Sequence, residues 1–359
     1  MNSLSKNLAK PQAHISDIVD GLSFSGDGAF IDDGKLYLNC VFEDVDWGDR
    51  LVSNVQFVNC KFGVAKFVGC VFDACLFENV FFEDAVFARC RLSDCSFVDV
   101  AGRNFRFDLS VLVSNVWNGV KANVIEINRA QLSMNVWNYI ESSELTFQNC
   151  ELCDHVFSSM VCNSLLFSES DIERVFIGDS SISQCSLQGG GGQMLRFLKS
   201  NVHAFVVDRV NLTQFALVDC LMNALVVTHA QLPLMQMQGC QLQQWQLRNC
   251  IATSILIDDV FFASWEMMLL ELHGGLLNKI SIEMLDANDV VWDKINVKDV
   301  GLNDVSCRSF VVKNSDFSGL SKQKWRGVDF RKVIFSEKLT DDERQWWDRF
   351  ECGASIFSS

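Results

Sequence analysis

Three residues near the middle of the chain have a spacing that could bind a metal ion. Cys150, Cys153 and His155 would supply two thiolates and an imidazole, which are ligands that zinc prefers. A metal site needs all three side chains to converge on one point. A five-residue repeat runs through this region and directs Cys150 and His155 inward but Cys153 outward. The sequence therefore argues against a metal site, and we expect no cofactor.

Two further motifs could carry chemistry. Cys352 is a candidate nucleophile, but only about 40 residues follow the repeats, which is too few for a catalytic domain. The tetraglycine Gly189–Gly192 lacks the flanking strand, helix and lysine of a phosphate-binding loop. A continuous repeat with an apolar interior also offers no pocket of converging polar groups. We therefore expect no catalytic residues and a protein that is not an enzyme.

The repeat is the strongest signal in the chain. Every fifth residue from Phe42 to Phe317 is apolar at 53 of 56 positions. A second column, which starts two residues earlier at Cys40, is apolar or Cys at 45 of 56 positions. A period of five fits neither the 3.6 residues of a helical turn nor the alternation of a strand. It predicts a chain that turns a corner at each repeat, with two residues of every five pointing inward.

This pattern resembles the pentapeptide-repeat family, in which a small residue is followed two positions later by Leu or Phe. The resemblance covers residues 38 to 317, and its clearest copies begin at Cys40, Cys60, Cys75 and Cys95. It implies an all-β fold, a right-handed quadrilateral β-helix in which four repeats form one coil. The 56 repeats would then form about 14 coils. The later half carries bulky residues at the inner small position, which predicts wider or less regular coils there.

The same pattern divides the chain into three parts. Residues 1–37 are predicted to form a leader and an N-terminal cap, in which Leu22–Gly34 makes a short hairpin. Residues 38–319 form the β-helix, and residues 320–359 form a last, shifted coil and a capping helix that begins at a capping box, Thr340–Glu343. The helix presents large apolar residues that either pack on the last coil or form a dimer contact, so we expect a monomer or an end-to-end homodimer. These residues are Trp346, Trp347 and Phe350.

Two irregularities in the inner columns need an explanation in packing terms. The tetraglycine keeps the fivefold register, which predicts an in-line kink or local unwinding, with a functional hinge as the alternative. One wall has four successive small residues, which we expect to be balanced by large residues on the other walls, because the packing density of an interior is constant. The small residues are Gly102, Ala122, Ser142 and Cys162, and the large ones are Phe107, Trp117, Trp137 and Phe147.

The cysteines and the hydropathy indicate where the chain is made. Eleven of the 15 cysteines lie in the inner small column, which indicates buried, reduced thiols. No apolar run approaches the roughly 20 residues of a membrane helix, so no membrane span is expected. Met1–Asp20 lacks the apolar core of a secretory signal. We therefore expect a bacterial chain that is cytoplasmic at synthesis, with export by a specialised secretion system as an alternative.

The net charge of −15 invites a comparison with DNA, because some pentapeptide-repeat proteins protect DNA gyrase by imitating the duplex. Duplex DNA carries one charge per about 1.7 Å, or nearly three per coil rise. The repeats here average about one net negative charge per coil, spread over four walls. Mimicry is therefore only an alternative function. No basic stripe is present, so direct binding of nucleic acid is not expected.

A neutral band lies between Arg209 and Arg248, where Asp219 is the only charged residue. Interfaces are depleted of charge, so the outward residues of this band are the predicted partner surface. The alternative is a neutral stretch of wall that contacts nothing. The predicted surface residues are Leu221, Val226, Leu234, Gln236, Gln238, Gln241, Gln243, Gln244 and Gln246.

These observations favour a non-enzymatic scaffold that binds a protein partner through its side walls or its capped end. A second hypothesis is a secretion-system effector or loading adaptor. A third is an acidic DNA mimic that protects a type II topoisomerase. The sequence does not identify the partner.

Overall fold

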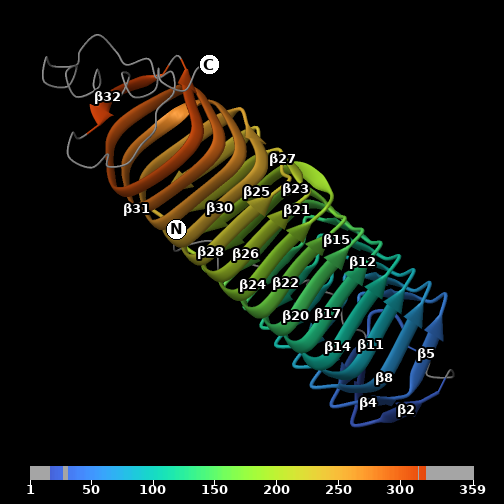
Figure 1. Ribbon diagram of the computed structural model, residues 1–359. Helices are drawn as coiled ribbons and strands as arrows, with labels where there is room; N and C mark the ends of the chain where they lie inside the picture. Colours follow the sequence, from blue (N-terminus) through green and yellow to red (C-terminus); the bar gives the residue numbers. More distant parts are fainter. Residues whose placement is uncertain (1–16, 27–30, 314, 321–359) are drawn as a thin grey trace, which may run out of the picture. The chain divides into compact units, whose positions relative to one another are not determined.

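The computed structural model describes residues 17–26, 31–313 and 315–320. Its contacts form two compact units, Met1–Ser164 and Leu165–Ser359. Within each unit the chain winds into parallel strands, and the residues described contain no helix (Figure 1). The predicted all-β class is confirmed, and the coils are consistent with a quadrilateral β-helix of about 13 turns.

Strand pairing has a constant offset of twenty residues through most of each unit. In the first unit, Phe77 pairs with Phe57 on one side and Phe97 on the other. In the second, Met222 pairs with Val202 and Leu242. Four five-residue repeats therefore make one coil, as the sequence predicts.

We name the four walls of a coil A to D in chain order. In one coil they are Val80–Asp84, Ala85–Arg89, Cys90–Asp94 and Cys95–Asp99, and each wall recurs every twenty residues. Most strands of the first unit are short and lie on one wall. These are β1 (Ile18–Asp20), β2 (Ser23–Ser25), β3 (Leu36–Leu38), β4 (Val41–Glu43), β5 (Val45–Gly48), β6 (Leu51–Ser53), β7 (Gln56–Val58), β9 (Val71–Asp73), β10 (Leu76–Glu78), β12 (Arg91–Ser93), β13 (Ser96–Val98), β15 (Val111–Val113), β16 (Val116–Asn118), β18 (Gln131–Ser133) and β19 (Val136–Asn138).

Other strands run through a corner and span two walls. In the first unit these are β8 (Lys61–Val68), β11 (Phe81–Ala88), β14 (Ala101–Asp108), β17 (Lys121–Asn128), β20 (Glu141–Gln148) and β21 (Glu151–Ser158). The next strand, β22 (Val161–Ser168), contains the boundary between the units. The second unit continues with six further strands of this kind, β23 (Asp171–Gly178), β24 (Ser181–Gln188), β25 (Gly191–Leu198), β26 (Asn201–Asp208), β27 (Asn211–Val218) and β28 (Leu221–Thr228). The short β29 (Leu234–Gln238), the longer β30 (Gln241–Ala252), the 60-residue β31 (Ser254–Lys313) and the short β32 (Asp316–Leu320) follow.

Residue types at the corners match the backbone conformation there. The corner between walls D and A has positive φ, and Asn39, Asn59 and Asn79 occupy it with φ of 52 to 53°. Asparagine tolerates this left-handed region, whereas a β-branched residue there is strained. From the second repeated coil onward the corner between walls A and B has no positive φ, and Val64 and Val124 occupy it. The chain stays extended at that corner, which produces the long strands.

The inner columns form the core, as predicted. Phe57, Phe77 and Phe97 stack on one another with ring centroids 5.0 and 4.8 Å apart. Trp117 continues this stack 3.8 Å above Phe97, and Trp137 follows 4.7 Å further on. All five side chains are at most 1% exposed. Offset stacking of this kind adds to the hydrophobic stabilisation that burial alone provides.

The inner small column is held by hydrogen bonds to main-chain carbonyls of the preceding coil. The Cys70 thiol donates to the oxygen of Trp47 at 3.2 Å, and the Asn135 amide donates to the oxygen of Leu112 at 2.9 Å. These bonds explain how polar groups are accommodated in an apolar interior. Burial raises the pKa of the Cys150 thiol to about 11, so it remains protonated and unreactive at neutral pH.

The predicted N-terminal hairpin is wrong for the residues described. β1 pairs with β3 and β2 pairs with β4, and both pairings are parallel with an offset of eighteen residues. Val19 and Phe24 are five residues apart, like Tyr37 and Phe42 in the next coil, so they continue the inner columns. The Phe24 ring stacks on Phe42 at 4.9 Å. β1 and β2 therefore add two parallel strands next to the first repeats.

The tetraglycine segment keeps the register of its neighbours, as predicted, and shows no unwinding. Gly192 pairs with Ile172 and Leu212. A Cβ atom on Gly192 would collide with the main-chain oxygen of Ile172, so glycine permits this close approach. At the other end of the second unit the register shifts within β32, where the sequence changes phase. Thr340–Glu343 lies outside the described residues.

Candidate functional site

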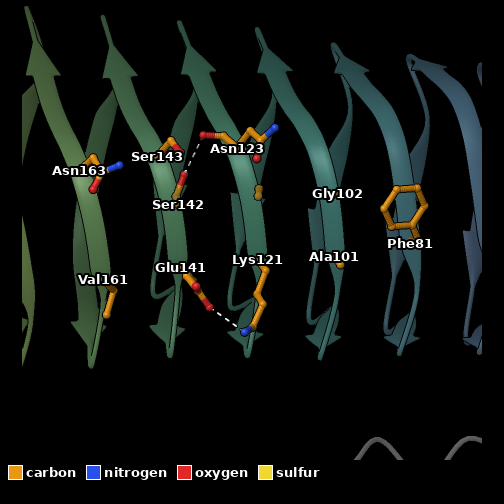
Figure 2. A pocket seen from close by; sticks show the side chains of 11 residues that line it. Phe81, Ala101, Gly102, Lys121, Asn123, Glu141, Ser142, Ser143, Val161 and Asn163 are labelled. Atoms are coloured by element: carbon orange, nitrogen blue, oxygen red, sulfur yellow. Dashed lines mark hydrogen bonds and ion pairs between the residues drawn. The ribbon is translucent and has the colours of Figure 1, made fainter.

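A shallow hollow lies on wall A of the first unit and has a volume of about 390 Å³. Figure 2 shows that its lining residues come from successive strands, so that polar groups recur from coil to coil. Phe81 lies at one end and Val161 at the other, and these side chains are 39% and 56% exposed. The hollow crosses the coils and is open to solvent.

Its floor is formed by the small inner residues of wall A. A Cβ atom on Gly102 would lie 2.7 Å from the ring of Phe105, which belongs to wall B. The large residue thus lies on wall A in one coil, as Phe82, and on wall B in the next coil, as Phe105. The two rings are 5.4 Å apart. The sequence predicted compensation by large residues of the other walls, Phe107, Trp117, Trp137 and Phe147. The nearest compensating atoms belong to the same strand, β14.

The polar groups of the hollow bond mainly to one another. The Lys121 ammonium lies 2.7 Å from the Glu141 carboxylate, and this contact raises the pKa of Lys121. The Ser142 hydroxyl donates to the main-chain oxygen of Glu144 at 2.8 Å and lies 3.4 Å from that of Asn123. A lysine held protonated does not act as a base, and the Ser142 hydroxyl donates its proton to main-chain oxygens, which are not bases. This arrangement favours binding over nucleophilic catalysis.

The three residues with metal-like spacing do not converge. Cys150 and His155 are buried on different walls, and the Cys150 thiol donates to main-chain oxygens. Cys153 faces outward, with its sulfur 3.5 Å from the Asp154 carboxylate. Over the described residues, no group of three or more His, Cys, Asp or Glu side chains could hold a metal ion.

The structure distributes the predicted partner surface over all four walls. Six of the nine residues lie on β28 and β30, where Leu221 pairs with Gln241 and Val226 with Gln246. The other three, Leu234, Gln236 and Gln238, lie on β29. The nine residues therefore form a band around the coils, and its role as a partner surface stays a prediction.

A single surface appears when residues are compared at twenty-residue steps. On wall A of the second unit, five successive coils have no Asp, Glu, Lys or Arg at any of their 15 outward positions. We call this the charge-free wall. It consists of Ser181, Ser183, Gln184, Asn201, His203, Ala204, Leu221, Asn223, Ala224, Gln241, Gln243, Gln244, Phe261, Ala263 and Ser264.

The charge-free wall combines amide and hydroxyl groups with exposed apolar groups. Leu221 is 42% exposed and Phe261 is 38% exposed. A chain with 21% charged residues would place about three charges in 15 positions at random. Reading the sequence along the chain did not reveal this wall, because the residues of the three other walls separate each of its rows from the next.

Charges border the charge-free wall on both sides. On wall B, Arg248 pairs with Glu266 at 2.7 Å, and Asp208 accepts bonds from Arg209 and Thr228. The corner between walls D and A carries a column of alternating sign, which we call the corner column. It consists of Asp179, Lys199, Asp219, Gly239, Asp259, Lys279 and Asp299, and its charged members are exposed.

Wall C also carries no Asp, Glu, Lys or Arg from Gly191 to Ser254. Its strand pattern is interrupted at Gln231–Pro233, where only isolated bridges remain. The corners that border wall C carry no alternating column. Wall A is thus the more regular of the two neutral surfaces.

Trp346, Trp347, Phe350 and Cys352 lie outside the described residues.

Part of the repeat region matches a known family. Residues 65–100 match the family model Pentapeptide repeats, with 8 copies. The chain contains pentapeptide repeats. In this segment the repeat residues Cys70, Cys75 and Cys90 occupy the inner small column, and Phe72 and Phe77 occupy the main column, all of them buried.

Comparisons with individual proteins add less than the repeat does. The structure of a trypsin-treated variant of QnrB1, a plasmid-mediated fluoroquinolone resistance protein, is 15% identical and covers 45% of this chain and 82% of its own. The TM-score is 0.15, so the fold assignment rests on the register and the repeat and not on this likeness. No curated protein matches the chain. Over the described residues, no helix has the length and hydropathy needed to cross a membrane.

Proposed function

We propose that this chain is a non-enzymatic scaffold that binds a protein partner through the charge-free wall. The observation that carries the proposal is the absence of charged residues from five successive coils of one wall, in a chain whose net charge is −15. The centres of protein interfaces are depleted of charge, because burying an unpaired charge is costly. The pentapeptide-repeat coil supports this function by holding the side chains on a regular lattice.

The wall has the composition of a binding surface that remains soluble when free. Its amide and hydroxyl groups can bond to water or to a partner, and Leu221 and Phe261 offer apolar contacts between them. Aromatic and apolar residues surrounded by polar ones are typical of interface centres. The rim of charged pairs, such as Arg248 with Glu266, would remain exposed around a bound partner.

The test is a quantitative capture experiment from cells of the native host. The wall variant carries Leu221→Lys together with Gln241→Lys, two residues that are paired on neighbouring strands of the wall. The control carries Ile251→Lys on wall C, where the side chain is 43% exposed, close to the 42% of Leu221. We expect a protein that the wild-type chain and the control retain to be lost from the wall variant. Equal capture by all three chains would contradict the proposal.

The secretion-system and DNA-mimic hypotheses remain predictions from the sequence. A supercoiling assay of gyrase with and without a quinolone would test the second of these. The domain limits at residues 37 and 319 also remain predictions.

A further inference from the structure

We propose that the partner of the charge-free wall is a second copy of this chain, docked wall to wall with its coils in the opposite direction. This inference rests on the proposed function, because it identifies the occupant of the same wall. It differs from the end-to-end dimer that the C-terminal aromatic residues suggest.

Electrostatics favour this wall for contact between two copies. Each copy has a net charge of −15, so contact through charged walls would bring like charges together. The charge-free wall lets two copies approach without burying any Asp, Glu, Lys or Arg of that wall. Leu221 and Phe261 supply exposed apolar area on each copy.

The corner column gives the contact a direction and a register. A two-fold axis parallel to the strands reverses the order of the coils in the second copy. Each column of outward residues then lies opposite the same column of the second copy. If the axis passes midway between the coils of Asp219 and Gly239, Asp179 faces Lys279 of the second copy. Lys199 then faces Asp259, and Asp219 faces the uncharged Gly239. No like charges oppose each other along this column.

A register centred on Gly239 itself is disfavoured. It would place Asp219 opposite Asp259 and Lys199 opposite Lys279, so every charged pair would be repulsive. A shift of the axis by one coil toward the C-terminus, to between Gly239 and Asp259, again alternates the signs and pairs Asp219 with Lys279. The midway register opposes four coils of the charge-free wall to those of the second copy, whereas the shifted register opposes only two, so the midway register is the one that we adopt.

The area indicates a weak association. With strands about 4.8 Å apart and residues about 3.3 Å apart, the four opposed coils of a five-residue wall present about 320 Å². Two walls would bury about 630 Å², which is about half of the roughly 1,200 Å² at the lower end of stable complexes. The dimer should therefore form and dissociate with concentration.

Sedimentation velocity of the full-length chain over a wide concentration range tests the inference. We expect the mass of a monomer at low concentration and of a dimer at high concentration. Lys199→Gln with Lys279→Gln should raise the dissociation constant about tenfold or more, because four ion pairs across the contact are lost. Ile251→Glu with Thr253→Glu changes the net charge equally on wall C and should leave dimerisation nearly unchanged.

A charge exchange tests the register. Lys279→Asp alone should weaken the dimer, and adding Asp179→Lys should restore it by reversing the facing pair. Restoration by Asp219→Lys instead would overturn the midway register.

A monomer at every concentration, or a dimer that Leu221→Lys leaves intact, would overturn the second copy as partner. The proposed function would still stand in that case if the wall variant lost a captured protein. If Leu221→Lys left the dimer intact and the wall variant still captured every protein, both proposals would fail.

Discussion

The imidazole of His155 lies in the lumen of the first unit and is fully buried. Among the described residues, neither of its ring nitrogens has a hydrogen-bond partner, and its ring lies 6.1 Å from that of Phe157. Loss of solvation lowers the pKa of His155 to about 4, and the nearby main chain of Leu132 and the Asp154 carboxylate oppose this only in part. His155 is therefore neutral at pH 7. Below pH 6.5 it stays uncharged in the folded chain until the pH approaches 4, whereas it is protonated once unfolding exposes it.

We expect His155 to make stability depend on pH. Its pKa is about 4 when folded and 6.5 when exposed, so its neutral form stabilises the fold above pH 6.5 and this stability is lost as the pH falls toward 4. The full loss is about 3 kcal/mol, of which about 2 kcal/mol is lost by pH 5. His155→Met should remove this loss. Urea unfolding at pH 7 and pH 5 measures it, and equal losses in both chains would contradict the assignment.

Glycine is required where an acidic side chain of the preceding coil lies over a left-handed corner. Gly119 has φ of 72°, and a Cβ atom there would collide with the Asp99 carboxylate. Gly119→Ala should cost about 1 to 2 kcal/mol. Gly48→Ala, which has ordinary φ and open space around it, should be nearly neutral. Thermal unfolding compares the two, and equal midpoints would show that the carboxylate moves aside freely.

At the scale of elements, β14 differs from β11 by an exchange of large and small residues across a corner. Phe82 and Ala85 in β11 pair with Gly102 and Phe105 in β14. The Phe105 ring occupies the space next to Gly102, and both strands keep the same register. The exchange leaves the main inner column of wall A with the small Gly102, and this small residue forms part of the floor of the hollow.

This exchange predicts coupling between the two positions. Phe105→Ala alone should cost about 3 to 5 kcal/mol through a cavity, and Gly102→Leu alone about 1 to 3 kcal/mol through overpacking. The double variant should cost less than the sum, because Leu at position 102 fills part of the space that Phe105 leaves. A double-mutant cycle from urea unfolding measures this term. Additive costs would mean that the two residues fill separate spaces.

The period of five predicted most of the structure because each column position carries one backbone role. It predicted the buried stack through Phe57, Phe77 and Phe97 and the twenty-residue coil. It missed the two parallel strands of Val19 and Phe24, because an offset of eighteen breaks the count between them and Tyr37. It also misplaced the partner of Gly102, since counting treats columns separately whereas packing joins them at a corner. The charge-free wall required the register, which a reading along the chain does not contain.

At the scale of the whole molecule, the inner columns exclude Asp, Glu, Lys and Arg with the one exception of Arg50, while the outer positions carry them. Phe77 shows how strict this separation is, since its ring lies between two other Phe rings and is 1% exposed. A carboxylate in its place would have no hydrogen-bond donors facing it within the stack. Stability thus depends on a continuous apolar interior, whereas the walls are free to vary.

Phe77→Asp should cost several kcal/mol, because it buries an unpaired charge and opens a cavity. We expect loss of cooperative unfolding or insoluble expression. Asn79→Asp adds the same charge at an exposed corner and should remain folded. Circular dichroism during heating distinguishes the two, and a folded, soluble Phe77→Asp chain would refute the inner-column assignment.

The twenty-residue register has a consequence for how such a chain can change in length. Removing a full coil of twenty residues leaves every later side chain on its original wall, with one coil fewer. Removing a single repeat of five keeps all inner residues inside but turns every later residue by one wall. A deletion of that size between Gln241 and Phe261 would carry Phe261 away from Leu221 while preserving the core. Duplications and deletions in multiples of five can therefore leave the fold intact. Only changes in multiples of twenty keep each later residue on its original wall.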